Sequence, residues 1–194
     1  MHIHTKHYRP RILLWLLLAA AVPRSIALAG PAGEGKELRF LGLVTHVPKV
    51  WNQAAPSSSM RLAQFATQDE AGKQTAELIF YYFGPGQGGS AEANIARWRS
   101  QFHRADGTLP EPRISKLSPS GLPITRVRLQ GSYARGIGAG PGGTGKPDQT
   151  LVAALLQTHK GLVTIQLHGD TVLVDTLEAG FDAMLDAIKP LDGD

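Results

Sequence analysis

The sequence predicts an α+β fold: a largely antiparallel sheet of about six strands with two main helices packed on it. The first observation behind this prediction is the order of segments, about three strands, a helix, three or four strands and a second helix. The second is that short turns join most of the strands, which favours hairpins over the long crossovers of parallel sheets. The third is that the sequence contains no cysteine, so packing alone must hold the core.

The first half of the sheet is predicted from three apolar segments. We expect strands over residues 38–47, 60–67 and 76–83, with an ordered loop that includes Trp51 and residues 56–59 between the first two. The third segment, AELIFYYF, is continuously apolar and aromatic. Such a run is typical of a central strand, so we expect it to be covered on both faces.

Two helices are predicted from apolar residues at helical spacing. The first follows a glycine-rich turn, with Ser90 as its N-cap and Glu92 complementing the helix dipole. We expect it over residues 91–103, with an apolar stripe formed by Ala91, Ile95, Trp98 and Phe102. The second helix begins after the cap Asp170 and ends before Pro190. Its core stripe is formed by Leu173, Leu177, Phe181, Met184, Leu185 and Ile188.

The second half of the sheet is predicted as strands over residues 114–117, 123–133, 151–158 and 162–168. The second of these alternates, with Val127 and Leu129 on one face and Arg126 and Arg128 on the other. The two arginines either form a solvated face or bind an acidic partner.

The first 29 residues have the pattern of a secretory signal peptide. A basic start without acidic residues leads into the apolar run 12–22, and Ala27-Leu28-Ala29 provides small residues where a signal peptidase cuts. The run is shorter than the roughly 20 residues that a membrane-spanning helix needs, so we expect cleavage near Ala29-Gly30 and no membrane span afterwards. The product would be periplasmic or secreted, with a retained N-terminal anchor as the alternative. It would have a flexible leader at residues 30–37 and one α+β domain at 38–190, with a Gly-rich mobile loop at 135–147.

Cleavage also changes the charge of the chain. The full sequence has 20 Lys and Arg against 16 Asp and Glu, but residues 1–29 hold four of the basic residues and no acid. The remaining domain is close to neutral, which argues against a nucleic-acid-binding surface. His2, His4 and His7, whose spacing resembles a metal site, leave with the same segment. The other histidines show no metal-ligand spacing, so we expect no metal and no cofactor.

The order of the segments resembles that of the PsbP/Mog1-like α/β/α sandwich. The matching features are Trp51 after the first strand, the turn Leu167-His168-Gly169 and the closing helix with Phe181, Met184 and Leu185. This resemblance covers roughly residues 38–190 and implies an accessory or binding role, with no functional residue carried over. Separately, PSSSMRLAQF (56–65) and FGPGQGGSAEANIARW (83–98) resemble segments of small exported bacterial proteins.

The glycine-rich turn at residues 84–90 is the candidate ligand site. It joins a strand to a helix N-terminus, where backbone N–H groups and the helix dipole favour an anion. Its candidate residues are Gly86, Gly88, Gly89 and Ser90, with Arg61 or Arg97 assisting from nearby. The alternative is a turn that needs glycine φ angles and in which Ser90 only caps the helix.

An aromatic groove is a related hypothesis. Trp51, Met60, Tyr81, Tyr82 and Trp98 either line such a groove or belong to the core. We expect any site to lie where the loop at residues 56–59 approaches the turn at 84–90.

Catalytic motifs are incomplete. The segment 88–92 has Glu92 where the nucleophile elbow G-x-S-x-G requires glycine, although His168 and Asp170 would complete a triad with Ser90. The segment 140–146 matches a phosphate loop only up to the lysine, because Pro147 follows where Ser or Thr is needed.

The function remains open at this level. The best interpretation is a non-enzymatic exported domain that binds an envelope protein or a small ligand. The alternatives are a serine-dependent hydrolase using Ser90 and an anion- or small-ligand-binding module at the 84–90 turn.

Overall fold

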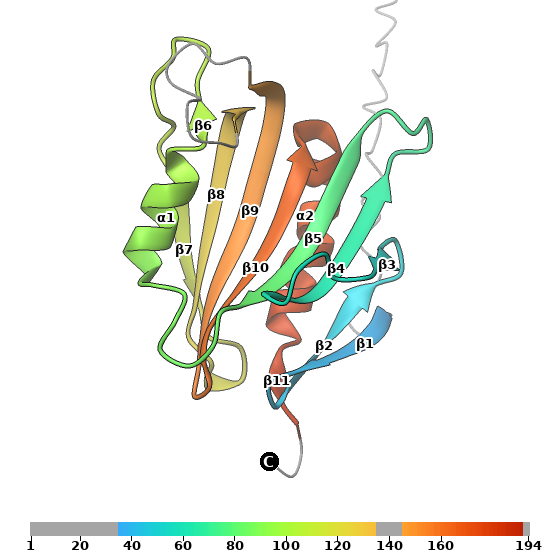
Figure 1. Ribbon diagram of the computed structural model, residues 1–194. Helices are drawn as coiled ribbons and strands as arrows, with labels where there is room; N and C mark the ends of the chain where they lie inside the picture. The colour runs from blue at the N-terminus through green and yellow to red at the C-terminus, as the bar shows by residue number, and fades with distance from the viewer. Residues whose placement is uncertain (1–34, 135–144, 192–194) are drawn as a thin grey trace, which may run out of the picture.

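The computed structural model describes residues 35–134 and 145–191, which form an antiparallel sheet between two helices (Figure 1). The predicted signal peptide, residues 30–34 of the predicted leader and most of the Gly-rich loop lie outside the described residues, whereas residues 35–37 of the leader form the start of a strand. In the described part of the chain, no helix is long and apolar enough to cross a membrane.

The main sheet has eight strands, and neighbouring strands pair antiparallel throughout. In spatial order they are β3 (Asn52–Ala54), β4 (Arg61–Gln68), β5 (Thr75–Tyr82), β10 (Gly161–Asp170), β9 (Lys146–Thr158), β8 (Ile124–Tyr133) and β6 (Phe102–His103), with β7 (Arg113–Leu117) also paired to β8. A short 3-10 helix, Pro119–Gly121, connects β7 to β8.

The two helices lie on opposite faces of this sheet. Helix α2 (Thr171–Asp186) packs over strands β5, β10 and β9, and all six residues of its predicted core stripe are buried. Helix α1 (Ala91–Arg99) lies on the other face, where Trp98 packs with residues of β8 and β9. A second, three-stranded sheet of β1 (Gly35–Phe40), β2 (Leu43–Pro48) and β11 (Lys189–Pro190) lies against α2.

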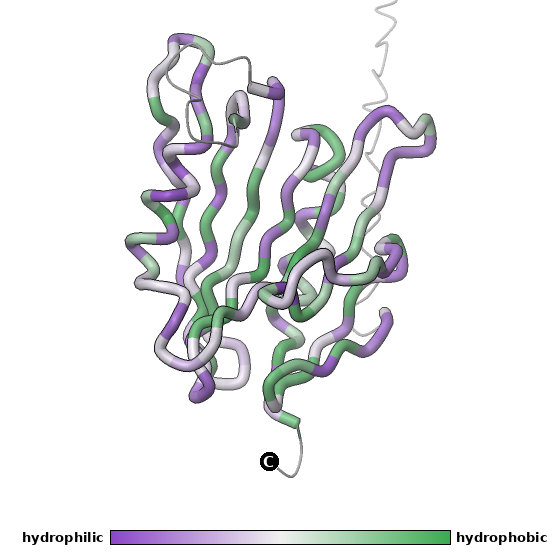
Figure 2. Tube along the Cα trace, in the orientation of Figure 1, coloured by the Kyte–Doolittle hydropathy of each residue, from purple (hydrophilic) through white to green (hydrophobic). Residues whose placement is uncertain are grey.

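Alternation of side chains assigns each strand residue to one of the two faces. Val163, Ile165 and Leu167 of β10 point into the α2 core, whereas Thr164 and Gln166 point to the α1 face. Figure 2 shows this alternation of hydrophobic and hydrophilic residues along β10, while β9 stays hydrophobic between residues 151 and 156 because it lies in the middle of the sheet with both faces covered.

The fold class is confirmed, and the expected number of about six strands is wrong, because the main sheet has eight and a further three form the second sheet. The strand count was too low partly because residues 38–47, expected as one strand, belong to a hairpin. The hairpin consists of β1 and β2 with a turn at Leu41 and Gly42. Leu41 adopts a φ of 51°, a conformation that leucine rarely takes, so the turn has a weak sequence signal. The first helix is also shorter than expected, because Phe102 and His103 leave it to pair with β8.

A groove beside helix α1 as the candidate functional site

The α1 face of the sheet is only partly covered. Helix α1 has nine residues and packs over the β8 and β9 side, so the same face of β5 and β10 is left beside it. A groove of about 290 Å³ lies between the helix and these strands. Strand β5 was expected to be covered on both faces; its Leu78 and Phe80 are buried under α2, but its other face lines this groove.

The floor of the groove consists of alternate residues of β5 and β10. Along β5, the row that faces the groove consists of Glu77, Ile79 and Tyr81. It continues to Phe83, just after the end of the strand. On β10, Gln166 lies opposite Ile79 and His168 lies opposite Glu77. The two-residue period of a strand thus brings a row of apolar, aromatic and polar side chains to one surface.

The wall of the groove is formed by the inner side of helix α1 and the turn after it. Arg97, Trp98 and Gln101 line it, with Trp98 almost fully buried against β8 and β9. Tyr133 closes one end, where its ring lies 4.3 Å from the ring of His168. The groove therefore combines four aromatic side chains with amide, guanidinium, imidazole and carboxylate groups.

Planar side chains are aligned along one part of the floor. The rings of Tyr81 and Phe83 are nearly parallel, with centroids 6.2 Å apart, as expected for residues i and i+2 on one strand face. The Arg61 guanidinium carbon lies 5.5 Å from the centre of the Tyr81 ring, which is a cation–π contact. Arg61, from the adjacent strand β4, thereby lies beside the groove, and its role in assisting a ligand at the 84–90 turn stays a prediction.

The predicted turn at residues 84–90 lies next to the groove and is fixed to helix α1 by one buried side chain. Asn94, only 2 % exposed, donates hydrogen bonds to the carbonyl oxygens of Gly88 at 2.7 Å and Ser90 at 2.9 Å. Its own oxygen accepts a 2.6 Å hydrogen bond from Arg97. Asn94 thus couples the shape of the turn to the position of an arginine in the groove.

The glycines of the turn have the backbone conformations that the alternative interpretation requires. Gly86, Gly88 and Gly89 all have positive φ, and a Cβ on Gly88 would come within 3.4–3.5 Å of Phe83 and Leu162. Gly88 therefore packs on Phe83, a residue of the groove, while Gly86 has open space around it.

Ser90 and Glu92 already occupy the N-terminus of α1. The Ser90 hydroxyl accepts a 3.1 Å hydrogen bond from the N–H of Ala93. The pKa of Glu92 lies below its usual value because its carboxylate accepts hydrogen bonds from its own backbone N–H and from Ser90. An external anion at this helix end would compete with that carboxylate.

The structure does not bring Ser90, His168 and Asp170, the three residues of the hypothetical catalytic triad, together. His168 lies beside Phe102, which follows α1, whereas Ser90 precedes α1, so roughly 13 Å of helix separates the two ends. Asp170 accepts hydrogen bonds from the N–H of Thr75 and from Gln149. Within residues 35–134 and 145–191, no group of three or more metal-ligating side chains is present. Residues 140–144 of the phosphate-loop-like segment 140–146 lie outside the described residues.

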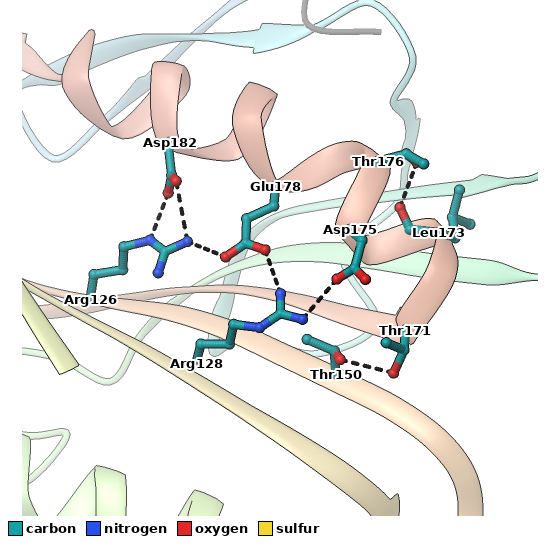
Figure 3. A network of polar contacts seen from close by, with 9 residues as sticks. All are labelled: Arg126, Arg128, Thr150, Thr171, Leu173, Asp175, Thr176, Glu178 and Asp182. Carbon is teal, nitrogen blue, oxygen red and sulfur yellow. Dashed lines mark hydrogen bonds and ion pairs between the residues drawn. The ribbon is translucent and has the colours of Figure 1, made fainter. Parts of the chain in front are cut away.

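Arg126 and Arg128 do not form a solvated face. On the α2 side of β8, they bind three carboxylates of that helix (Figure 3). Glu178 bridges both guanidiniums, Asp182 pairs with Arg126 at 2.7 Å, and Asp175 pairs with Arg128 at 2.7 Å. Burial opposes the charge of Arg126, but its bonds to Asp182 and Glu178 outweigh this effect and raise its pKa. Neither arginine is left for an acidic partner.

The aromatic groove hypothesis is correct for some residues and wrong for others. Met60, Tyr81 and Trp98 line the groove, whereas Trp51 belongs to the core under α2. Tyr82 also points to that side, and its hydroxyl donates a 2.6 Å hydrogen bond to the carbonyl of Lys160. Residues that the sequence did not single out for the groove are Glu77, Ile79, Phe83, Gln101, Tyr133, Leu151 and Gln166. Strand periodicity identifies Phe83 and Ile79 once Tyr81 is placed, but no local signal identifies Gln101 or Tyr133.

The layers, with one helix on each face of an antiparallel sheet, are those that the PsbP/Mog1-like resemblance predicts. Among solved structures, the chain is similar to the solution structure of cyanobacterial PsbP (CyanoP) from Synechocystis sp. PCC 6803. The similarity covers 84 % of this chain and 96 % of that chain, at 15 % sequence identity and a TM-score of 0.48. No family model and no curated protein sequence matches the chain.

Proposed function

We propose that this chain is a non-enzymatic exported domain that binds a small ligand in the groove beside α1. The observation that carries the proposal is the half-covered sheet face, where aromatic side chains and hydrogen-bonding groups line one concave space. Ligand sites in proteins are typically concave, largely apolar and provided with a few polar groups that orient the ligand.

The rest of the described surface favours a small ligand over a large protein partner. The large exposed apolar residues of that surface are scattered over loops, one strand and one helix. They are Val50, Met60, Leu109, Ile114 and Val172. A stable protein–protein interface buries about 800 Å² on each partner, usually around an apolar centre. Only Met60 among these residues lies at the groove.

The hydrolase alternative has less support. The Ser90 hydroxyl is engaged as a helix cap, and neither His168 nor Asp170 lies beside it. A nucleophilic serine needs a base within hydrogen-bond reach. The anion-binding alternative at the 84–90 turn stays a prediction, in which the ligand would displace the Glu92 carboxylate from the helix end.

A fragment screen by ligand-observed NMR tests the binding proposal. We expect fragments that compete with one another for one site, with binding lost in Tyr81→Ala because the floor of the groove is removed. Ile114→Ala is the matched control, since it removes an exposed apolar side chain from β7, away from the groove. Binding that is indifferent to Tyr81→Ala, or a screen without any competing fragments, would contradict the proposal.

Export is tested separately. Expression of the full chain in a bacterial host with a periplasm should yield a periplasmic product. Its N-terminal sequence should begin at Gly30, and its mass should equal that of residues 30–194. Recovery of only the uncleaved chain, in the cytoplasm or in the membrane fraction, would overturn this part of the proposal.

A further inference from the structure

Eight arginines lie within residues 35–134 and 145–191, and four of them form an ion pair with a carboxylate. Arg39, Arg99, Arg126 and Arg128 each form an ion pair with a carboxylate. Arg61 and Arg97, which lie at the groove, have no carboxylate partner within residues 35–134 and 145–191. Arg61 contacts the Tyr81 ring, and Arg97 donates to the neutral amide of Asn94. Neither positive charge is thus paired with a carboxylate of the described residues.

Both arginines are connected to residues at one end of the groove. Arg61 lies over Tyr81. Arg97 is linked through Asn94 to Gly88, and Gly88 packs on Phe83. Tyr81 and Phe83 are the two aromatic residues at the end of β5. Arg61 therefore contacts this aromatic surface directly, and Arg97 is connected to it through Asn94 and Gly88.

The negative charge of the groove lies at its other end. Glu77 precedes Tyr81 by four residues on the same strand face, which places the two about 13 Å apart along the strand. This separation exceeds the screening length of about 8 Å at physiological ionic strength. The Glu77 carboxylate consequently does little to neutralise the arginine end, and His168 lies opposite Glu77 rather than near the arginines.

We propose that the groove binds a ligand in which an anionic group, a carboxylate or a phosphate, is joined to a flat apolar body. The inference rests on the proposed function of the groove and specifies its ligand class. The anionic group is held by Arg97 and Arg61, since guanidinium groups bind planar carboxylates and phosphates through charge-assisted hydrogen bonds. The apolar body packs on Tyr81, Phe83 and Ile79.

This placement differs from an anion site at the helix N-terminus. The N-terminus of α1 is occupied by the Glu92 carboxylate and by the cap Ser90. The role of the glycine turn is then indirect: Asn94 holds the turn and orients Arg97 with the same side chain. Arg97 binds the anionic group together with Arg61, and Asn94 is a positioning residue.

Titrations of the chain with three probes, followed by NMR chemical shifts, test the inference. The probes are 3-phenylpropionate, its neutral analogue 3-phenylpropanamide and phenyl phosphate. We expect the two anions to bind at least tenfold more tightly than the amide, and Arg97→Gln to abolish that preference. Arg104→Gln is the matched control, because Arg104 is also an exposed arginine without an ion pair but lines a different hollow, beside β6. The ratio of carboxylate to phosphate affinity separates these two sources of the anionic group.

The outcomes separate the inference from the proposed function. If the amide binds as tightly as the anions and Tyr81→Ala removes all three, the groove is a binding site and the anion inference is wrong. If Arg97→Gln and Arg104→Gln weaken anion binding equally, the attraction is nonspecific and the inference is also wrong. If no probe binds and the fragment screen finds no site, both the inference and the proposed function fail.

Discussion

The two faces of the main sheet use the same kinds of residue for different purposes. On the α2 face, Arg126 and Arg128 are 15 % and 12 % exposed and are fully engaged with helix carboxylates. On the α1 face, Arg61 and Arg97 have no carboxylate partner in the described part of the chain, and aromatic residues of the same face line an open groove. The α2 face therefore contributes stability, while the α1 face carries groups available to a ligand.

The cause of this difference is the extent of each helix. Helix α2 has 16 residues and a second sheet packs against it, so the face below it is closed. The hydroxyl of Thr45 in β2 even donates a 2.6 Å hydrogen bond to the carbonyl of Met184 in α2. Helix α1 has nine residues, and no second layer formed by the described residues packs on it, so it covers only part of its face. A short helix on a wide sheet leaves a groove at its side.

Removal of a large core side chain from the α2 face should have the largest effect. Phe181 is 1 % exposed, and Phe181→Ala should lower the free energy of unfolding by about 3–5 kcal/mol, because the ring leaves a cavity in the closed core. Urea unfolding followed by tryptophan fluorescence measures this change. Val172→Ala, on the exposed side of the same helix, should change it by no more than about 0.5 kcal/mol. Similar values for the two variants would mean that α2 does not seal this face.

Glu178→Gln should have the next largest effect. It removes the charge that bridges Arg126 and Arg128, and we expect a loss of about 1.5–3 kcal/mol in the free energy of unfolding. Glu111→Gln is the matched control, since the Glu111 carboxylate pairs with Arg99 but is 72 % exposed, and such pairs contribute about 1 kcal/mol or less. A Glu178→Gln variant as stable as the control would contradict the structural role of the network.

Asp170 should make stability depend on acidity at the start of α2. Burial raises its pKa, but hydrogen bonds from the N–H of Thr75, from Lys146 and from Gln149 outweigh burial and lower the pKa below its usual value of 3.8. The carboxylate thus stabilises the fold above that value, and the contribution disappears as the pH falls through the lowered pKa. Unfolding measured between about pH 5 and pH 2 should show a smaller acid-induced loss in Asp170→Asn than in the unaltered chain. Parallel curves would refute this role.

Arg97→Gln should have the smallest effect on stability. Among the described residues its guanidinium bonds only to Asn94, and we expect the free energy of unfolding to change by about 0.5 kcal/mol or less. Thermal or urea unfolding measures this directly. A loss as large as that of Glu178→Gln would show that Arg97 is structural, and the contrast between the two faces would then disappear.

Much of the fold was predictable because the core helices and central strands have strong periodic patterns. The α2 stripe from Leu173 to Ile188 and the β10 alternation are both confirmed. The Leu41–Gly42 hairpin was missed because leucine rarely adopts positive φ. Asp170 occupies the N-cap position of α2 as expected, but its carboxylate bonds across to Thr75 and Gln149 rather than to the helix.

The site was less predictable than the fold. Residue type suggested Tyr81, Met60 and Trp98 as groove residues, whereas Arg61 and Arg97 were candidates only for assisting a ligand at the 84–90 turn. The groove itself depends on how far α1 extends across the sheet, which is a tertiary property. The continuous apolar run of β5 suggested burial on both faces, although the residues on one of them line the groove. Local sequence could not distinguish the two cases, because a groove floor and a core are both apolar.

A map of NMR chemical-shift changes on addition of 3-phenylpropionate tests the central claim most directly. The account predicts the largest changes in the backbone amides of Tyr81 and Phe83 and in the indole N–H of Trp98, together with residues 97–101 of the groove wall. The amides of α2 and β2, on the closed face, should not shift. Changes concentrated on α2 or β2, or the absence of any saturable change, would contradict the claim that the α1 face carries the binding site.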